Sequence, residues 1–359
     1  MQLTSLQCRG FRGLADIHFE PGPGLNVLRG ANAQGKTSVL EALLYAATAR
    51  SHRTASDQEI VRHGADAFHI IAEAQAVERA VRIEAHWWRG AKRFKINGLA
   101  QTRLSDILGR LCVVFFSPED IALVKGAAAS RRLFLDMELS QLQPAYLRAL
   151  QQYRQAMRQR NELLRRDQAD SDMLSAWEAQ LDEHGKTLMR ERAAYIATLS
   201  KLAAEYYARV VADEPLHLIY RPDIADPDAI AATLCRARKT DLIRKSTGRG
   251  PHRDDVEILI AEKPARAFGS QGQQKSAALI IKLAEVELMR GRMGEYPLVL
   301  LDEALAELDG ERSQRLLDAL PEPAQAIITT AQPGQLPDLS HRATHMFFIE
   351  RGALEKIAT

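Results

Sequence analysis

The sequence predicts an α/β fold in which one domain, built on a mixed β-sheet, is divided in two by a helical insertion. Short apolar segments of strand length occupy the first third of the chain and return after residue 239. Between residues 130 and 211, apolar residues recur at intervals of three and four, which is typical of helices packed through one face. The length of 359 residues agrees with two structural units.

The first third of the chain is rich in strand candidates. They lie at residues 3–8, 16–20, 25–29, 68–77, 80–88, 93–96 and 111–116. Asn97-Gly98 indicates a hairpin turn, because both residue types accept the left-handed backbone that a tight hairpin needs. Residues 111–116 are continuously apolar, which fits a strand buried on both faces.

The middle of the chain predicts a helical hairpin. Residues 130–211 contain one proline, Pro144, and one glycine, Gly185, and the polar stretch 165–172 can turn the chain back on itself. We interpret the apolar stripe as helix packing and not as a cofactor site. The hairpin has the size of a subdomain arm and is too short for a long coiled coil.

The last third returns to strands, at residues 256–260, 297–301, 325–330 and 344–349, with a helix over 276–289. We therefore expect one α/β lobe made of residues 1–120 and 265–359. Residues 121–264 are expected to form a mostly helical second lobe.

Composition agrees with an ordinary globular protein. Apolar residues make up 46% of the chain, and the net charge of +2 gives no overall field that would attract nucleic acid, so DNA contacts need local basic patches. No apolar stretch approaches the ~20 residues that cross a bilayer, and the N-terminus lacks a signal-peptide pattern. Cys8, Cys112 and Cys235 show no disulfide or metal spacing, so we expect buried thiols and a cytoplasmic protein without a membrane partner.

A phosphate-binding loop follows the strand candidate 25–29. The string Gly30-Ala31-Asn32-Ala33-Gln34-Gly35-Lys36-Thr37 fits the pattern G-x-x-x-x-G-K-T, and a helix-like segment opens at Ser38. Its glycines let backbone N–H groups point at phosphate oxygens, and Lys36 adds a positive charge at the β and γ phosphates. Thr37 supplies a hydroxyl ligand for Mg²⁺. Residues 30–38 are therefore the predicted ATP contacts, with Lys36 also counted as catalytic.

An acidic partner to this loop ends the strand candidate 297–301. Asp302 stands where a second protein ligand for Mg²⁺ is needed, and Glu303 can act as the general base toward the attacking water. A buried strand that merely ends in surface acids would look the same. The phosphate loop favours the catalytic interpretation, because it requires such a partner.

Four further strings resemble motifs of known ATPases. Phe268-Gly269-Ser270-Gln271-Gly272-Gln273-Gln274-Lys275 resembles the signature loop of ABC-type ATPases, and Ala306-Glu307-Leu308-Asp309 resembles their D-loop. With Gly250-Pro251-His252-Arg253-Asp254-Asp255 and Ser117-Pro118-Glu119-Asp120 added, the resemblance is to the RecF family, the recombination mediator ATPases related to SMC heads. It covers nearly the whole chain and implies an ABC-type ATPase head, in which a helical second lobe leads into the signature loop.

The resemblance implies an ATP site that two copies complete. Ser270, Gly272 and Gln273 of one copy would contact the γ-phosphate of the ATP held by Lys36 of the other. Gln271 departs from the transporter pattern, which usually has Gly there, but it fits the RecF family. Glu303 also departs from the family, which often has Asp at that position, and it is closer to other ABC enzymes.

The resemblance also assigns several residues outside these strings. Arg9 and Arg12 resemble head residues that reach nucleotide phosphates, although a solvated basic turn is an equal alternative for Arg9. Arg53 resembles an arginine that contacts nucleotide or DNA. As candidates to sense the γ-phosphate the sequence offers Glu119 and Gln332, or else Thr329 or Thr330.

DNA contacts are expected from local basic clusters. Arg131 and Arg132 form one cluster and Arg53 lies in another segment, although solvated charges are the alternative for any single cluster. The resemblance implies binding to duplex DNA or duplex–single-strand junctions, an ATP-dependent homodimer, and slow, DNA-stimulated hydrolysis. As partners it implies RecR, together with RecO in loading RecA on gapped DNA.

Three other functions remain to be compared with this one. The ATPase subunit of an ABC transporter would share the phosphate loop, but not the 250–255 string or the long helical insertion. A full SMC or break-repair head needs a much longer coiled coil than about 80 helical residues provide. A P-loop kinase would leave the signature and D-loop strings without a role.

Overall fold

The computed structural model describes residues 1–77, 79–166, 170–211, 214–305, 310–331, 339 and 342–357. The chain forms two compact units. Unit 1 consists of residues 1–120, 209–212 and 282–359, and unit 2 of residues 121–208 and 213–281. The predicted mixed α/β class is confirmed. None of the helices within the described ranges is long and apolar enough to cross a membrane.

An antiparallel sheet of unit 1 has the strand order β2-β1-β4-β5-β6-β7. Its strands are β1 (Gln2–Phe11), β2 (Leu14–Phe19), β4 (Ala67–Gln75), β5 (Ala80–Trp88), β6 (Ala91–Ile96) and β7 (Leu99–Gln101). Buried and exposed side chains alternate along β4 and β5, so one face of the sheet lies on the core. Asn97 and Gly98 both have positive φ, which confirms the predicted tight turn between β6 and β7.

The second sheet of unit 1 has the order β15-β14-β3-β13-β12-β8 and is parallel except for the β14–β15 pair. Its strands are β3 (Leu25–Arg29), β8 (Val113–Phe116), β12 (Leu298–Leu301), β13 (Ala326–Thr330), β14 (Thr344–Glu350) and β15 (Ala353–Lys356). All side chains of β8, β12 and β13 are buried, as expected of strands covered on both faces. Because β13 lies between β3 and β12, the strands that lead into the phosphate loop and the acidic pair are not neighbours.

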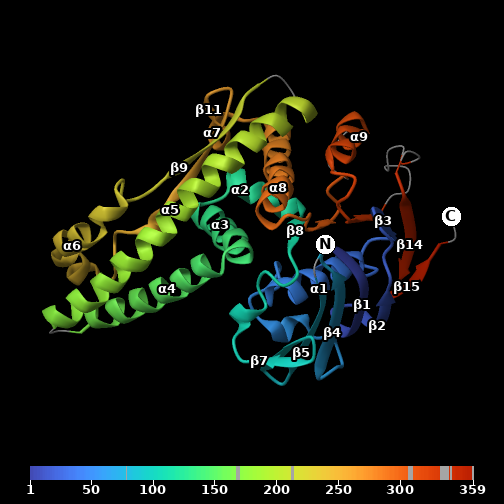
Figure 1. Cartoon of the computed structure of the whole chain (residues 1–359), viewed down its shortest axis with the longest axis horizontal. Coiled ribbons are helices and arrows are strands. Elements are labelled where there is room, and N and C mark those ends of the chain that lie inside the picture. The colour runs from blue at the N-terminus through green and yellow to red at the C-terminus, as the bar shows by residue number, and fades with distance from the viewer. Residues whose placement is uncertain are drawn as a thin grey trace. The chain divides into compact units, whose positions relative to one another are not determined.

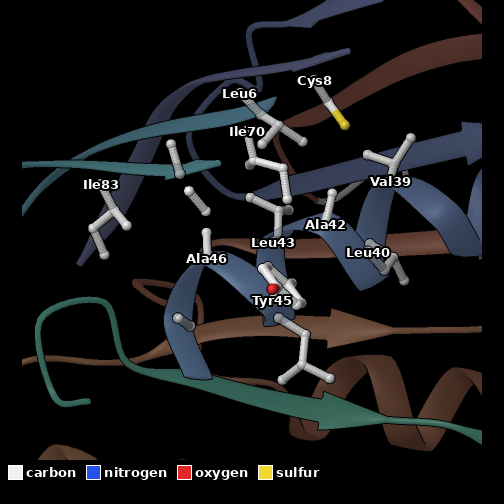
Figure 2. Packing of buried hydrophobic residues seen from close by; sticks show 14 of the residues in the cluster. Leu6, Cys8, Val39, Leu40, Ala42, Leu43, Tyr45, Ala46, Ile70 and Ile83 are labelled. Atoms are coloured by element: carbon white, nitrogen blue, oxygen red, sulfur yellow. The ribbon is translucent and has the colours of Figure 1, made fainter. Parts of the chain in front are cut away.

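Helix α1 (Lys36–Thr48) forms the centre of the core of unit 1. Its side chains are buried on nearly every side, because the helix contacts strands of both sheets. Figure 2 shows the apolar side chains of α1 packed against those of the antiparallel sheet, among them Val39, Leu43, Ala46, Leu6, Ile70 and Ile83. Each fully buried aliphatic side chain of this kind stabilises the fold by about 1.5–3 kcal/mol. The phosphate loop is therefore attached to the most rigid part of the unit. Unit 1 also contains α9 (Gly310–Ala319) and the single-turn segments η1 (Asp57–Ile60), η2 (Leu104–Asp106) and η3 (Pro118–Asp120).

Unit 2 is mostly helical. Its helices are α2 (Ile121–Lys125), α3 (Ala128–Leu142), α4 (Pro144–Leu164), α5 (Ser171–Val210), α6 (Ile230–Arg244), α7 (Ala265–Phe268) and the first part of α8 (Gln271–Met293). Unit 2 also contains a three-stranded sheet of order β11-β10-β9. Its strands are β9 (Leu216–Arg221), β10 (Asp255–Ile260) and β11 (Lys263–Pro264). The single-turn segments η4 (Pro227–Ala229) and η5 (Pro251–Arg253) also belong to this unit. Helices α4 and α5 lie side by side as the predicted hairpin (Figure 1), and α5 is one continuous helix.

The family-specific string 250–255 has a structural role within unit 2. Arg192, which is 2% exposed, donates to Asp254 Oδ2 at 2.9 Å, to Asp136 Oδ1 at 2.8 Å and to the Pro251 carbonyl at 2.7 Å. His252 Nδ1 is 2.9 Å from the Tyr153 hydroxyl on α4. Breaking a buried ion pair of this kind typically costs about 3–5 kcal/mol. The string therefore holds α3, α4 and α5 onto the sheet.

One expectation about the cysteines was wrong. Cys8 and Cys112 are buried and free, but Cys235 is exposed and free. It lies on α6, most of whose residues face solvent because only Ile230, Leu234 and Asp241 of that helix are buried.

Candidate nucleotide-binding site

The phosphate loop connects β3 to the first turn of α1. Ala33 and Gly35 both have positive φ, at 63° and 113°, which gives the loop the tight curl that turns successive N–H groups inward. A Cβ atom at position 30 would lie 2.3 Å from the Ile349 carbonyl oxygen, so only glycine fits there. Gln34 fixes the loop to the β14–β15 hairpin, accepting from Arg351 N at 2.6 Å and from Gly352 N at 3.0 Å.

Lys36 lies beneath this loop and is 3% exposed. Its ammonium group donates to the carbonyl oxygens of Gly30 and Ala31, both at 3.0 Å, and Nζ is 3.6 Å from Glu303 Oε1. A buried ammonium group strongly favours an anionic neighbour, because its charge is poorly screened there. The position of Lys36 is therefore suited to the phosphates of a nucleotide.

Two threonine side chains from different segments contact Asp302. Asp302 Oδ1 accepts from Thr37 Oγ1 at 2.9 Å and from Thr329 Oγ1 at 2.8 Å. Thr329 comes from β13, the strand between β3 and β12. Thr329 Oγ1 also accepts from the backbone N–H of Glu303 at 2.9 Å, so it holds both residues of the acidic pair. The hydrogen bond from Thr37 to Asp302 joins the two motifs predicted to share one site.

The ionisation of Asp302 is sensitive to a neighbouring cation. Burial raises the pKa of its carboxyl group above the ordinary value, and the carboxylates of Glu303 and Glu119 act in the same direction, while the hydrogen bonds from Thr329 and Thr37 lower it. A desolvated carboxylate next to a threonine hydroxyl is the oxygen donor set that Mg²⁺ prefers. The residues present therefore fit the Mg²⁺ ion that the sequence predicts.

Glu303 has an unusual backbone for a non-glycine residue. Its φ is 48°, in the left-handed region, and its side chain is 37% exposed. Strained backbone of this kind occurs often at functional sites, since the surrounding structure must hold it in place. The geometry turns Glu303 toward Lys36 and leaves its carboxylate accessible to water.

Arg12 contacts helix α1 through an ion pair that was not predicted from the sequence. Its guanidinium donates to both oxygens of Glu41, at 3.0 and 2.7 Å, and to the Glu59 carbonyl at 2.9 Å. Glu41 on α1 is fully buried and also accepts from Ser51 Oγ at 2.5 Å. The single carboxylate within the apolar segment 39–47 was the sequence feature that could have indicated this ion pair. Arg53, which follows Ser51 in the same loop, is exposed.

The signature loop lies at the start of α8, in unit 2. Ser270 N donates to Gln273 Oε1 at 2.8 Å, and Gln273 N donates to Ser270 Oγ at 3.2 Å, which is a reciprocal capping box. Ser270 and Gly272 are exposed, and Gln273 is half-buried. A helix start of this kind attracts anions.

The remaining predicted site residues lie in different environments. Arg131 is 5% exposed, and its guanidinium contacts Asp255 Oδ1 at 2.6 Å, so it stabilises unit 2 and is not accessible to DNA phosphates. Arg132 is half-buried and donates to the Asp254 carbonyl at 2.7 Å. Arg9 is exposed and paired with Asp16, and Glu119 is exposed. The D-loop string 306–309 and Gln332 lie outside the described residues.

Comparison with known proteins identifies the family of this chain. The family model of the RecF/RecN/SMC N-terminal domain matches residues 2–355. A protein of Symbiobacterium thermophilum named DNA replication and repair protein RecF is 40% identical, over 97% of this chain and 96% of its own. The chain belongs to the RecF family. Another RecF, from Pediococcus pentosaceus, is 36% identical, over 99% of this chain and 98% of its own.

Solved structures of RecF share the fold over the whole length. The structure of the recombination mediator protein RecF-ATP in the RecFOR pathway has a TM-score of 0.92 and 30% identity, and covers 99% of this chain and 98% of its own. A second RecF structure, with ATPrS, has a TM-score of 0.90 and 31% identity over the same shares. An SMC head bound to the winged-helix domain of ScpA is similar in fold alone, with 16% identity and a TM-score of 0.62.

Proposed function

We propose that this RecF-family chain is an ATP-hydrolysing DNA repair and recombination mediator whose ATP site is completed by a second copy. The hydroxyl–carboxylate cluster of Thr37, Asp302 and Thr329 is the observation that carries the proposal. It joins the phosphate loop to the acidic strand end and leaves Lys36 and Glu303 beside it. The solved RecF-ATP structures, which share 30–31% identity with this chain, support ATP as the nucleotide.

The residues act in distinct ways in this proposal. Backbone N–H groups of residues 30–38 bind the phosphates, and Lys36 stabilises the charge that develops on them. Thr37 and Asp302 hold Mg²⁺, which supplies charge neutralisation when bound. Glu303 accepts a proton from the water that attacks the γ-phosphorus, while the ADP oxygen leaves with the bonding electron pair.

The second copy supplies Ser270, Gly272 and Gln273. Their exposed, capped helix start binds the γ-phosphate across the dimer, so that ATP holds the two copies together and hydrolysis releases them. The dimer binds duplex DNA or duplex–single-strand junctions, which stimulate its slow turnover. It acts with RecR and RecO to load RecA on gapped DNA, and Arg53 and Arg132 remain the candidates for DNA contact.

Mixing two inactive variants tests the shared site. Lys36→Met removes the phosphate-loop cation and Ser270→Arg blocks the signature loop, so each variant alone should neither dimerise with Mg-ATP nor hydrolyse it. A mixed dimer contains one site with both defects and one site with neither. We therefore expect the equimolar mixture to recover ATPase activity and a dimer mass in light scattering.

Three results would contradict the shared site. A mixture as inactive as its components would mean that the two defects do not lie in opposite halves of one site. Full activity of Ser270→Arg alone would show that the site is complete within one chain. Wild-type protein that stays monomeric with Mg-ATP and with duplex DNA would exclude the dimer itself.

A further inference from the structure

A large aromatic side chain is exposed beside the signature loop. Phe268, the last residue of α7, is 70% exposed. Among the described residues of unit 2, it is the aromatic member of the exposed large apolar side chains, the others being Leu133, Met173, Leu242 and Ile243. An exposed aromatic ring gains free energy when a partner covers it, and aromatic residues are enriched at the buried centres of protein interfaces.

Phe268 is exposed but held firmly on both sides. Before it, the buried Gln274 side chain donates to the Ala265 carbonyl at 2.9 Å, and Gly269 N donates to the same oxygen at 3.0 Å. After it, the capping box of Ser270 and Gln273 fixes the start of α8. A Cβ atom at position 269 would lie 2.7 Å from the Ala265 oxygen, so the glycine keeps this turn tight. A side chain with a fixed backbone loses little freedom when a partner covers it.

The surroundings of Phe268 match the centre of a protein interface. The neighbouring Ser270 and Gln271 are exposed and polar, and Glu214 Oε2 accepts from Gln273 Nε2 at 2.9 Å. An apolar anchor within a polar rim is the usual anatomy of a specific interface. Residues two positions apart lie within about 7 Å of each other. A surface that closes on Ser270 therefore comes within reach of the Phe268 side chain.

We propose that Phe268 anchors the ATP-bound dimer by packing on the second copy, next to its phosphate loop. This inference rests on the proposed function, in which Ser270 faces the ATP of the second copy. Exposed residues of that loop include the small side chains of Ala31 and Ala33, which leave room for an aromatic ring. Because a two-fold dimer uses each surface twice, the ring contributes at two equivalent places.

Sedimentation velocity with a slowly hydrolysed ATP analogue tests the anchor. Phe268→Ala should raise the dimer dissociation constant roughly 100-fold, since each of the two contacts contributes about tenfold. Phe268→Leu should retain most of the dimer. Ile243→Ala is the matched control, because Ile243 is 83% exposed on α6, away from α7 in unit 2 (Figure 1). ATP affinity of the dilute monomer should stay within about twofold in all three variants.

The outcomes separate this inference from the proposed function. Equal dimer constants for wild type and Phe268→Ala overturn the anchor and leave the shared site standing. An unchanged dimer with weaker DNA binding would assign Phe268 to DNA and also overturn it. Loss of ATP affinity in the Phe268→Ala monomer would show a role within one chain. A wild-type protein that never dimerises removes the proposed function, and the anchor with it.

Discussion

Two helices of this chain begin at loops that we assign to the same triphosphate, but they satisfy their first N–H groups differently. At the start of α1, Gly35 takes a left-handed conformation and no side chain caps the helix. At the start of α8, Ser270 and Gln273 cap each other's backbone. The N–H groups of α1 therefore need a ligand, whereas α8 begins with a structure that is stable alone. This difference fits the proposed function, in which the first loop binds the nucleotide of its own chain and the second contacts it only after dimerisation.

The sharpest test of this comparison removes the proposed base. Glu303→Gln keeps the side-chain shape but cannot accept the proton, so turnover should fall about a thousandfold while ATP-dependent dimers persist. Phosphate release and light scattering measure the two properties. Glu311→Gln, an exposed carboxylate on α9, is the control. Unchanged turnover in Glu303→Gln would remove Glu303 as the base.

The next largest effect is expected at Lys36. Lys36→Met removes a buried charge that would form two charge-assisted contacts with phosphates, so ATP affinity should fall about a hundredfold. Titration with a fluorescent ATP analogue measures it. Lys125→Met, at an exposed position in unit 2, is the matched control. If the two variants bind ATP equally well, the phosphate-loop assignment is wrong.

A smaller effect is expected at Thr329, which holds both residues of the acidic pair. Thr329→Val keeps the shape but removes a hydrogen bond to Asp302 and one from Glu303 N. We expect roughly a tenfold loss of Mg-ATP affinity. Thr329→Ser retains the hydroxyl and should restore it. Equal affinity in the Val and Ser variants would mean that the Thr329 hydroxyl does not contribute to Mg-ATP binding.

The smallest effect distinguishes the two roles of Ser270. Ser270→Ala removes the cap and should lower the free energy of unfolding of the monomer by about 1 kcal/mol in urea denaturation. Ser270→Asp keeps the cap, so the monomer should keep its stability, but its negative charge opposes the γ-phosphate and should prevent dimers. A Ser270→Asp protein that dimerises like wild type would separate this loop from the nucleotide.

The site was predictable from sequence where its parts are local. The strand before Gly30, the helix after Gly35 and the acidic end of β12 are each encoded by neighbouring residues, and the structure places them together. Thr329 was available only as one of several alternatives, because the strand order that puts β13 between the motifs is not written in any local pattern.

Ion pairs between residues far apart in the sequence were difficult to predict from local patterns. Arg131 next to Arg132 resembles a basic patch, but the carboxylate that engages Arg131 lies 124 residues later, at Asp255. The partner of Arg12 is also distant in the sequence, and the signal for it is that Glu41 is the single acidic residue of an apolar helix segment. Strands β9 and β15 also went unpredicted; β15 has four residues, three of them exposed, whereas β9 has six residues, one of them exposed. The division into lobes at residues 120 and 265 stays a prediction.

The hairpin that holds the phosphate loop has a consequence for biosynthesis. Gln34 accepts from Arg351 N, and the two residues are 317 positions apart. At roughly 10 residues per second, the ribosome needs about 30 s to make the chain between them. Throughout that interval the nascent polypeptide has its loop sequence but lacks the strands that brace it. The braced form of the phosphate loop is therefore reached only after nearly the whole chain has emerged.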